Sequence, residues 1–281
     1  MGLGLGSSLA KSGLITPGIV TDNLVLKHNY SANGNIPVSD GAAYFSNTND
    51  YINIDGLAGD LVTDAAFSFS CWFNCLETGL AGGDDEHKSI IFSGHDVSDS
   101  YANIFRLGVN INNDASPIGG IYVVDNQDNS TVHTDSSNKD TGTKYFNDAK
   151  WHHLAVTIVG GASDTTIKVY IDGIELTNYW ATNGDADSNV IDPQFDNADK
   201  FSIGQEWDNS AVISDFFHGY ICNVGVWSKT LTQPQIKSIM WKNYAGLTGD
   251  ATSGEKQSLV SWWNLSADAN DSHGSNNGTL S

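Results

Sequence analysis

Residues 67–75 read FSFSCWFNC, and this stretch decides the fold class of the chain. Apolar side chains occupy every second position, at Phe67, Phe69, Cys71, Phe73 and Cys75. The positions between them hold Ser68, Ser70, Trp72 and Asn74. This period of two predicts one long β-strand whose two sets of side chains point to opposite faces of a sheet.

The same alternation, interrupted by polar turn residues, predicts further short strands on both sides of this stretch. They cover residues 43–45, 51–54, 89–93, 104–110, 120–124, 152–158, 167–171, 174–176, 201–205, 219–227 and 258–264. Asp172-Gly173 predicts a tight hairpin turn between two of them. Many short strands joined by polar turns are typical of an antiparallel β-sandwich.

One helix is expected in the second half of the chain. Thr232 and Gln235 have the spacing of a capping box, and Pro234 stands in the first turn. An apolar stripe follows at Ile236, Ile239 and Met240. Gly246 is the expected end of this helix.

The chain is interpreted as a short arm followed by one large domain. Residues 1–20 are rich in Gly, Leu and Ser, and Met1, Leu3, Leu5 and Leu9 are expected to anchor this arm to a neighbouring protein. Residues 21–281 form the sandwich domain. Within it, residues 177–200 are too long for a plain hairpin loop, so they are predicted to form a functional excursion or a lid.

Composition restricts the partners that the chain is expected to bind. Its formal net charge is −20, which disfavours nucleic acid and anionic membranes and favours cations, although a merely solvated acidic surface is the alternative. Residues 1–8 show neither the basic start nor the apolar stretch of a secretory signal, and no membrane span is expected. The three cysteines are spaced for neither a disulfide framework nor a zinc site, so buried thiols are expected.

Several strings, taken in order, resemble the laminin G-like and pentraxin group of concanavalin A-like sandwiches. They are residues 40–45 with 49–52, residues 67–73, residues 151–157 with 169–173, and residues 219–227 with the helix. The resemblance implies an all-β concanavalin A-like jelly roll with one short helix. Residues 262–265 and 270–274 look like an opening strand of the group, here placed last, which implies termini that meet at adjacent strands.

Calcium binding is implied by the same resemblance. Residues 204–208 read GQEWD and resemble the Gly-Gln-Glu-Gln-Asp run through which pentraxins bind calcium. The implied ligands are Glu206, the main-chain carbonyl of Trp207, Asp208, Asp215 and Asp99. Clustered loop oxygens suit Ca²⁺, but ordinary turn acids are the alternative interpretation.

Two departures from the group concern other residues. Asn223 stands where laminin G-like domains often carry Asp, which weakens any site that depends on it. The pentraxin disulfide is missing, because Cys71 occupies one half while Ala155 stands at the other.

Catalysis finds little support in the sequence. Glucanases of this fold need two glutamates a few positions apart on one strand, and Glu77, Glu86, Glu175, Glu206 and Glu255 are not so placed. His152 and His153 are neighbours on a predicted strand, so their imidazoles should face opposite ways. Trp180 and Trp207 are candidates to stack on a sugar ring, with core packing as the alternative.

Three functions stay open, and the first is favoured. It is a non-enzymatic virion structural protein, since the arm with a laminin G-like domain resembles virion proteins of marine tailed phages. The arm would bind a major capsid or other virion protein, repeated copies would assemble, and the sandwich on the virion surface would contact host glycans. The alternatives are an extracellular calcium-dependent lectin and an atypical glycan-cleaving enzyme.

Overall fold

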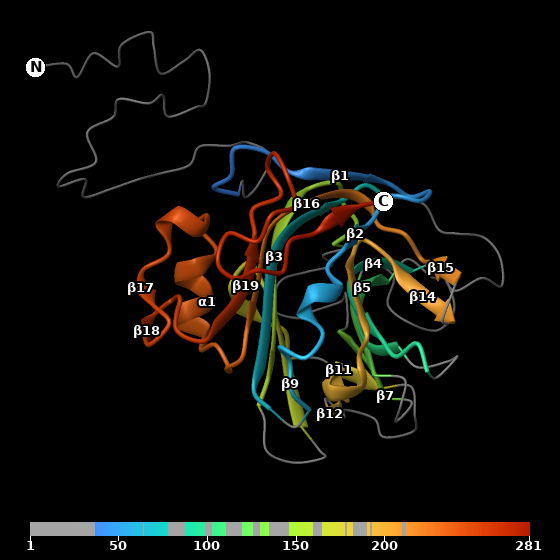
Figure 1. Ribbon diagram of the computed structural model, residues 1–281, viewed down its shortest axis with the longest axis horizontal. Helices are drawn as coiled ribbons and strands as arrows, with labels where there is room; N and C mark the ends of the chain where they lie inside the picture. Colours follow the sequence, from blue (N-terminus) through green and yellow to red (C-terminus); the bar gives the residue numbers. More distant parts are fainter. Residues whose placement is uncertain are drawn as a thin grey trace, which may run out of the picture.

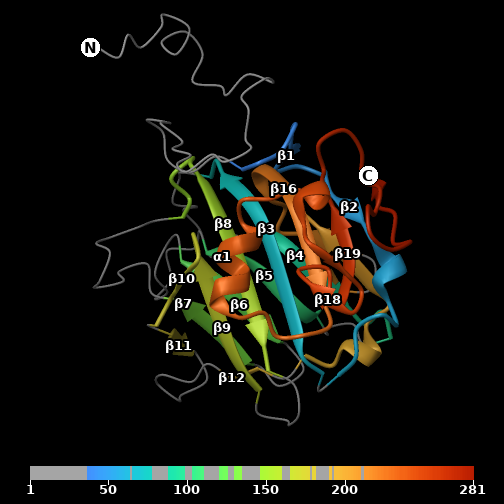
Figure 2. The same ribbon diagram turned by 90° about the vertical axis from the view of Figure 1, so that its left-hand side faces the viewer.

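Two antiparallel β-sheets face each other across one core, and a helix covers part of the outer face of one sheet (Figures 1 and 2). This computed structural model describes residues 37–63, 65–77, 88–98, 103–110, 120–125, 130–134, 146–159, 165–177, 179–181, 190–191, 193–209 and 212–281. The antiparallel sandwich expected from the alternation is confirmed. The arm of residues 1–20 lies outside the described residues.

Sheet A contains the strand that decided the fold class. Its strand order is β1 (Ala43–Ser46), β16 (His218–Trp227), β3 (Phe67–Cys75), β8 (Trp151–Ile158), β9 (Thr165–Ile171) and β10 (Ile174–Glu175). Two further strands join it, since β19 (Leu259–Trp263) pairs with β16 and β12 (Val190–Ile191) pairs with β9. Asp172 and Gly173 form the predicted hairpin turn, both at positive φ.

Sheet B lies opposite and is built mainly from the middle of the chain. Its order is β11 (Tyr179–Ala181), β7 (Ser130–Thr134), β6 (Ile121–Asp125), β5 (Asn103–Asn110), β4 (Lys88–His95), β13 (Lys200–Ile203), β2 (Ile52–Asn53) and β20 (Thr279–Leu280). Two small hairpins lie outside both sheets. They are β14 (Glu206–Asn209) with β15 (Val212–Ser214), and β17 (Gly249–Asp250) with β18 (Ser253–Gly254).

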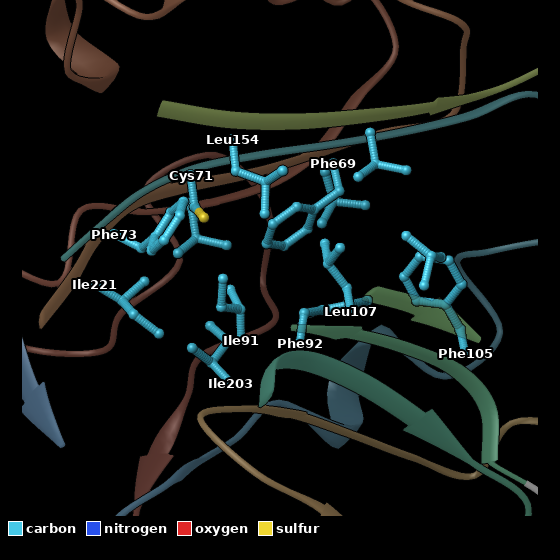
Figure 3. Close-up of a cluster of buried hydrophobic side chains, with 14 of the residues drawn as sticks. Phe69, Cys71, Phe73, Ile91, Phe92, Phe105, Leu107, Leu154, Ile203 and Ile221 are labelled. Carbon is cyan, nitrogen blue, oxygen red and sulfur yellow. The ribbon is translucent and has the colours of Figure 1, made fainter. Parts of the chain in front are cut away.

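The inner faces of the two sheets form one large apolar core (Figure 3). Alternate residues of β3 point into it, as the period of two predicts, and all of them are buried. Phe69 meets Phe92 of sheet B with ring centroids 4.9 Å apart. Full burial of side chains of this size contributes roughly 1.5–3 kcal/mol each, so this core is the main source of stability.

The three cysteines are free and buried thiols, as expected. Burial raises the pKa of Cys75 to about 11 and that of Cys222 to about 12. The implied disulfide position needs a correction, because Cys71 is in register with Leu154, and Ala155 pairs with Ser70 on the opposite face of the sheet.

The edge of β16 is filled by two segments from opposite ends of the domain. β1 pairs with the first half of β16 and β19 with the second half, so the two segments lie end to end along one strand. Asn223 marks the junction at a φ of 51°. Its amide Nδ2 donates to the carbonyl of Val38, and its backbone N–H donates to the carbonyl of Asn264.

Helix α1 (Gln233–Ile239) covers part of the outer face of sheet A (Figure 2). The predicted start is confirmed, because the N–H of Thr232 donates to Oε1 of Gln235 at 2.9 Å. The predicted end at Gly246 is wrong. The chain leaves the helix at Met240, and Gly246 closes a separate 3-10 turn, Tyr244–Gly246, where it donates to the side chain of Asn243.

The 3-10 turns Asp55–Leu57 and Phe195–Asn197 complete the regular elements. Within the described part of residues 177–200, β11 joins sheet B and β12 joins sheet A, so this excursion passes from one sheet to the other. No helix in the described residues is long and apolar enough to span a bilayer.

Candidate functional site

The acid at the centre of the predicted calcium run is bound to an arginine. Glu206 is 2% exposed, and its Oε2 lies 2.8 Å from Nη1 of Arg106 on β5. Its Oε1 accepts a longer hydrogen bond of 3.4 Å from Ser214. Held in this way, Glu206 does not fit a calcium ligand, because a guanidinium already neutralises it and both of its oxygens have donors.

The other predicted ligands contribute little that the structure describes. Asp215 follows β15 at a φ of 49°, and its charge helps to raise the pKa of Arg106 against the lowering effect of burial. Asp99 and the side chain of Asp208 lie outside the described part of the chain. Within that part, no three His, Cys, Asp or Glu side chains are grouped as metal ligands.

The predicted sugar-stacking tryptophans are not exposed platforms where they are described. Trp207 is 4% exposed and stacks on His95 with ring centroids 5.6 Å apart. Its ring is therefore a core side chain, which corrects the prediction of an open face. The side chain of Trp180 lies outside the description, as do Met1, Leu3, Leu5 and Leu9.

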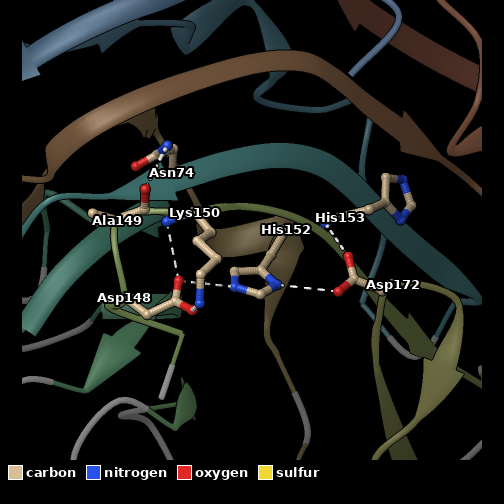
Figure 4. Close-up of polar contacts among 7 residues, drawn as sticks. All are labelled: Asn74, Asp148, Ala149, Lys150, His152, His153 and Asp172. Atoms are coloured by element: carbon tan, nitrogen blue, oxygen red, sulfur yellow. Dashed lines mark hydrogen bonds and ion pairs between the residues drawn. The ribbon is translucent and has the colours of Figure 1, made fainter. Parts of the chain in front are cut away.

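A histidine bracketed by two carboxylates lies where β8 begins (Figure 4). Nδ1 of His152 is 3.1 Å from Oδ2 of Asp172, and its Nε2 is 3.2 Å from Oδ1 of Asp148. Burial by itself lowers the pKa of His152, but the hydrogen bonds and charges of Asp172 and Asp148 outweigh it and raise the pKa. Both imidazole nitrogens are engaged, so the ring acts as an ionic bridge and is poorly placed to serve as a general base.

His153 faces the other way, as the strand geometry predicts. Its ring is 1% exposed on the outer side of sheet A, and Nε2 lies 2.9 Å from the hydroxyl of Ser70. Burial lowers the pKa of His153 to about 3, which keeps the imidazole neutral. The two histidines therefore serve opposite faces of one sheet.

The outer face of sheet A carries a row of aromatic side chains beside the end of helix α1, where Trp151 is partly buried against the cluster of Trp72, Cys222 and Met240. Tyr44, Tyr220, Asn74 and Trp151 lie at directly paired positions on the neighbouring strands β1, β16, β3 and β8. We call these four residues the aromatic row. Tyr44 is 51% exposed and Tyr220 is 37% exposed.

The rings of the row approach one another closely. The ring centroids of Tyr44 and Tyr220 are 5.0 Å apart, and those of Tyr220 and Trp151 are 6.2 Å apart. β16 and β8 are separated by β3, or by about 9–10 Å at the usual strand spacing, so the rings of Tyr220 and Trp151 lean together over Asn74. The rings thus form one continuous aromatic surface.

Gly219 allows strands β16 and β3 to approach each other closely beside the row. Its φ is 141°, and a Cβ atom at this position would lie 1.9 Å from the carbonyl oxygen of Asn74. Only glycine permits that approach. The close contact places Tyr220 directly beside Asn74.

A hydrogen bond connects the row to the bracketed histidine. Nδ2 of Asn74 donates to the carbonyl of Ala149 at 3.3 Å (Figure 4). The neighbouring Asp148 binds Nζ of Lys150 at 2.6 Å and also His152. The two neighbours of Trp151 in the sequence, Lys150 and His152, are therefore both held by ionic contacts with Asp148.

Sequence reasoning missed both the aromatic row and Arg106. The row had a usable signal, since Tyr44, Tyr220 and Trp151 fall on the strand parity opposite to that of the core residues. Arg106 had one as well, because it is the only charged residue in the apolar stretch of residues 104–109. Neither signal identifies the partner of the residue in space.

Comparison with known proteins identifies the family. A laminin G family model, described as the concanavalin A-like lectin/glucanases superfamily, matches residues 46–237. The chain belongs to this superfamily, which confirms the resemblance read from its strands. A search of curated proteins found no match.

Several solved structures are similar to this chain. A putative carbohydrate binding protein from Bacteroides ovatus aligns with a TM-score of 0.52 at 21% identity, over 85% of this chain and 57% of that one. The chain thus spans little more than half the length of that protein. The CBM40 of a Ruminococcus gnavus sialidase aligns with a TM-score of 0.47 at 11% identity, over 72% of this chain and 99% of that one. Domains LG4-5 of the mouse laminin alpha1 chain align with a TM-score of 0.36 at 13% identity, over 66% of this chain and 40% of that one.

Proposed function

We propose that this protein is a non-enzymatic carbohydrate-binding module. The observation that carries the proposal is the aromatic row, an open surface of tyrosine and tryptophan rings on a sandwich of a lectin superfamily. Aromatic rings with a polar edge or hydroxyl bind sugars by stacking on apolar C–H faces while leaving hydroxyl groups hydrated. The bridged state of His152 and the ion pair of Glu206 support binding over cleavage, because neither group is free for acid–base work.

A carbohydrate array incubated with the full chain tests this function. We expect saturable binding to at least one immobilised carbohydrate, with the bound sugar recovered intact by chromatography. Absence of binding to every member would overturn the proposal. Release of shortened products would replace it with glycan cleavage.

The proposed setting is the surface of a virion, with repeated copies anchored through residues 1–20. Support comes from the Gly-rich and Leu-rich composition of that segment, and from the net charge of −20, which suits an exposed protein. Deletion of residues 1–20 should leave the carbohydrate binding intact and abolish incorporation into particles. Continued incorporation would remove the anchoring role and favour the extracellular lectin.

Calcium dependence stays a separate proposal that rests on Asp99, Asp208, Asp215 and the main-chain carbonyl of Trp207. Thermal unfolding with Ca²⁺ and with a chelator tests it. Saturation to one hundred times Kd adds about 2.7 kcal/mol to the stability of a protein that binds. An unchanged melting temperature would remove calcium from the account.

A further inference from the structure

The aromatic row leaves an unusual amount of ring surface open to solvent. Tyr44 is 51% exposed and Tyr220 is 37% exposed, and Trp241, just after helix α1, is 45% exposed. Trp241 tilts against Trp72 at 5.8 Å, so it extends the aromatic surface toward helix α1. A contiguous apolar patch on a soluble protein usually marks a binding surface.

The net charge of the chain disfavours acidic ligands at the row. The four residues of the row carry no formal charge. Glu77 and Asp148 lie beyond its strands at one end, but each already faces a basic side chain, His218 in the first case and Lys150 in the second. The whole chain adds a net charge of −20. A carboxylated sugar brought to this surface meets a repulsive field, whereas a neutral sugar does not.

The arrangement of the rings favours an extended ligand over a single sugar. The centroids follow one another at 5.0 and 6.2 Å, with planes tilted by 47° and 44°. The three rings thus follow one another across the strands with differently oriented planes. Successive sugar rings of an oligosaccharide have a comparable spacing, so a chain lying across the strands would contact one aromatic ring after another.

A buried acceptor beneath the rings supplies a polar contact. Oδ1 of Asn74 is shielded from solvent and accepts no hydrogen bond from the residues that the structure describes. A buried acceptor without a donor costs about 1–3 kcal/mol. When the rings of Tyr220 and Trp151 move apart, a ligand hydroxyl group can donate to this oxygen and relieve that cost.

From these observations we propose that the aromatic row binds an uncharged oligosaccharide laid across strands β1, β16, β3 and β8. The inference rests on the proposed carbohydrate binding and adds the place, the direction and the chemical class of the ligand. Stacking on Tyr44, Tyr220 and Trp151 supplies the contact, and the net charge of −20 disfavours carboxylated glycans.

The test uses an array that pairs neutral oligosaccharides with their sialylated and uronic acid counterparts. Wild-type protein should bind neutral members and should bind their acidic counterparts at least threefold more weakly at low salt. Tyr44→Ala and Tyr220→Ala should each weaken binding about threefold to tenfold, as expected for loss of one aromatic contact. Tyr44→Phe and Tyr220→Phe keep the ring and should bind almost like wild type.

Ile174→Ala is the matched control, since Ile174 is 48% exposed on sheet A away from the row. Unchanged binding by both alanine variants of the row would overturn this inference and leave the proposed function in place. Preference for acidic glycans would overturn the chemical class. A dimer that Tyr44→Ala dissociates would show that a second copy covers the row, which also overturns the inference. Failure of wild type to bind any member would overturn the proposed function itself.

Discussion

The outer face of sheet A has two halves that treat aromatic residues in opposite ways. In the covered half, Trp72, Trp227 and Trp262 lie under helix α1 and the C-terminal segment, and each is at most 1% exposed. Each indole N–H has a partner, respectively the carbonyl of Met240, the carbonyl of Glu255 and the side chain of Asn264. In the open half, the rings of the aromatic row meet solvent.

The difference separates aromatic residues that stabilise the fold from aromatic residues that are exposed to solvent. The same strands β16, β3 and β8 supply both halves, so backbone geometry is shared. The covered rings are fixed by packing and by hydrogen bonds, which makes them part of the stability of the fold. The open rings contribute little to stability, which leaves them available for the proposed ligand.

The largest effect is expected in the covered half, from Trp227→Ala. Trp227 is fully buried and meets Trp262 edge to face at 6.0 Å. Its removal leaves a cavity and should lower the free energy of unfolding by about 3–5 kcal/mol. Urea unfolding followed by circular dichroism measures this loss. A loss under about 1 kcal/mol would contradict the assignment of this half to stability.

Glu255→Gln is expected to weaken the contacts that join helix α1 to the segment around Thr248 over the covered half. Its Oε1 accepts from Ser238 and Lys242, and its Oε2 accepts from both N–H and hydroxyl of Thr248. Loss of hydrogen bonds to a charged group should cost about 1.5–3 kcal/mol at pH 7.

Acid should remove this contribution of Glu255. Burial works to raise its pKa, but the bonds from Lys242, Ser238 and Thr248 outweigh it and lower the pKa. The stabilisation is therefore complete at pH values above the ordinary glutamate pKa of about 4.3. It is lost as the pH falls through the lower pKa that Glu255 has in the folded protein. Unfolding of both proteins between pH 7 and pH 3 should show the gap closing; a constant gap would refute the ionic role.

His152→Gln probes the support beneath Trp151. The pKa of His152 is raised in the folded protein. The stabilisation that its ion pairs supply is therefore complete below the ordinary histidine pKa of about 6.5 and is lost as the pH rises through the raised pKa. We expect the variant to lose about 1 kcal/mol at low pH and less at pH 9. His218→Gln, which has one carboxylate partner, is a suitable control. A gap that widens with pH would contradict the bridge.

The smallest effect on stability is expected in the open half. Tyr44→Ala and Tyr220→Ala remove rings that are 51% and 37% exposed. Each should change the free energy of unfolding by about 0.5 kcal/mol or less, as for most surface substitutions. Chemical denaturation at pH 7 measures it. A loss comparable with that of Trp227→Ala would erase the distinction between the two halves.

Much of the fold follows from local patterns. The alternation in residues 67–75 places Phe69 and Phe73 in the core, and the capping box places the start of helix α1. The end of the helix was not predictable, because it depends on Asn243 capping a new turn. Nor were the two-residue strands, whose pairing partners lie far away in the sequence.

The site was harder to predict because long-range contacts decide it. Glu206 reads as a calcium ligand until Arg106, one hundred positions away, is brought to 2.8 Å. Trp207 reads as a platform until His95 covers it. Strand parity identifies Tyr44 and Tyr220 as outward residues, but only the placement of helix α1 shows which outward residues stay open.

The end-to-end seating of β1 and β19 along β16 has a consequence for biosynthesis. While a ribosome is still adding residues 259–263, half of the β16 border has no neighbour and displays unpaired amides and carbonyls. The tail then also adds β20 to the opposite sheet beside β2. The nascent domain is therefore exposed to wrong partners until residues 259–280 emerge, and chains released before that point should depend on chaperones to avoid aggregation.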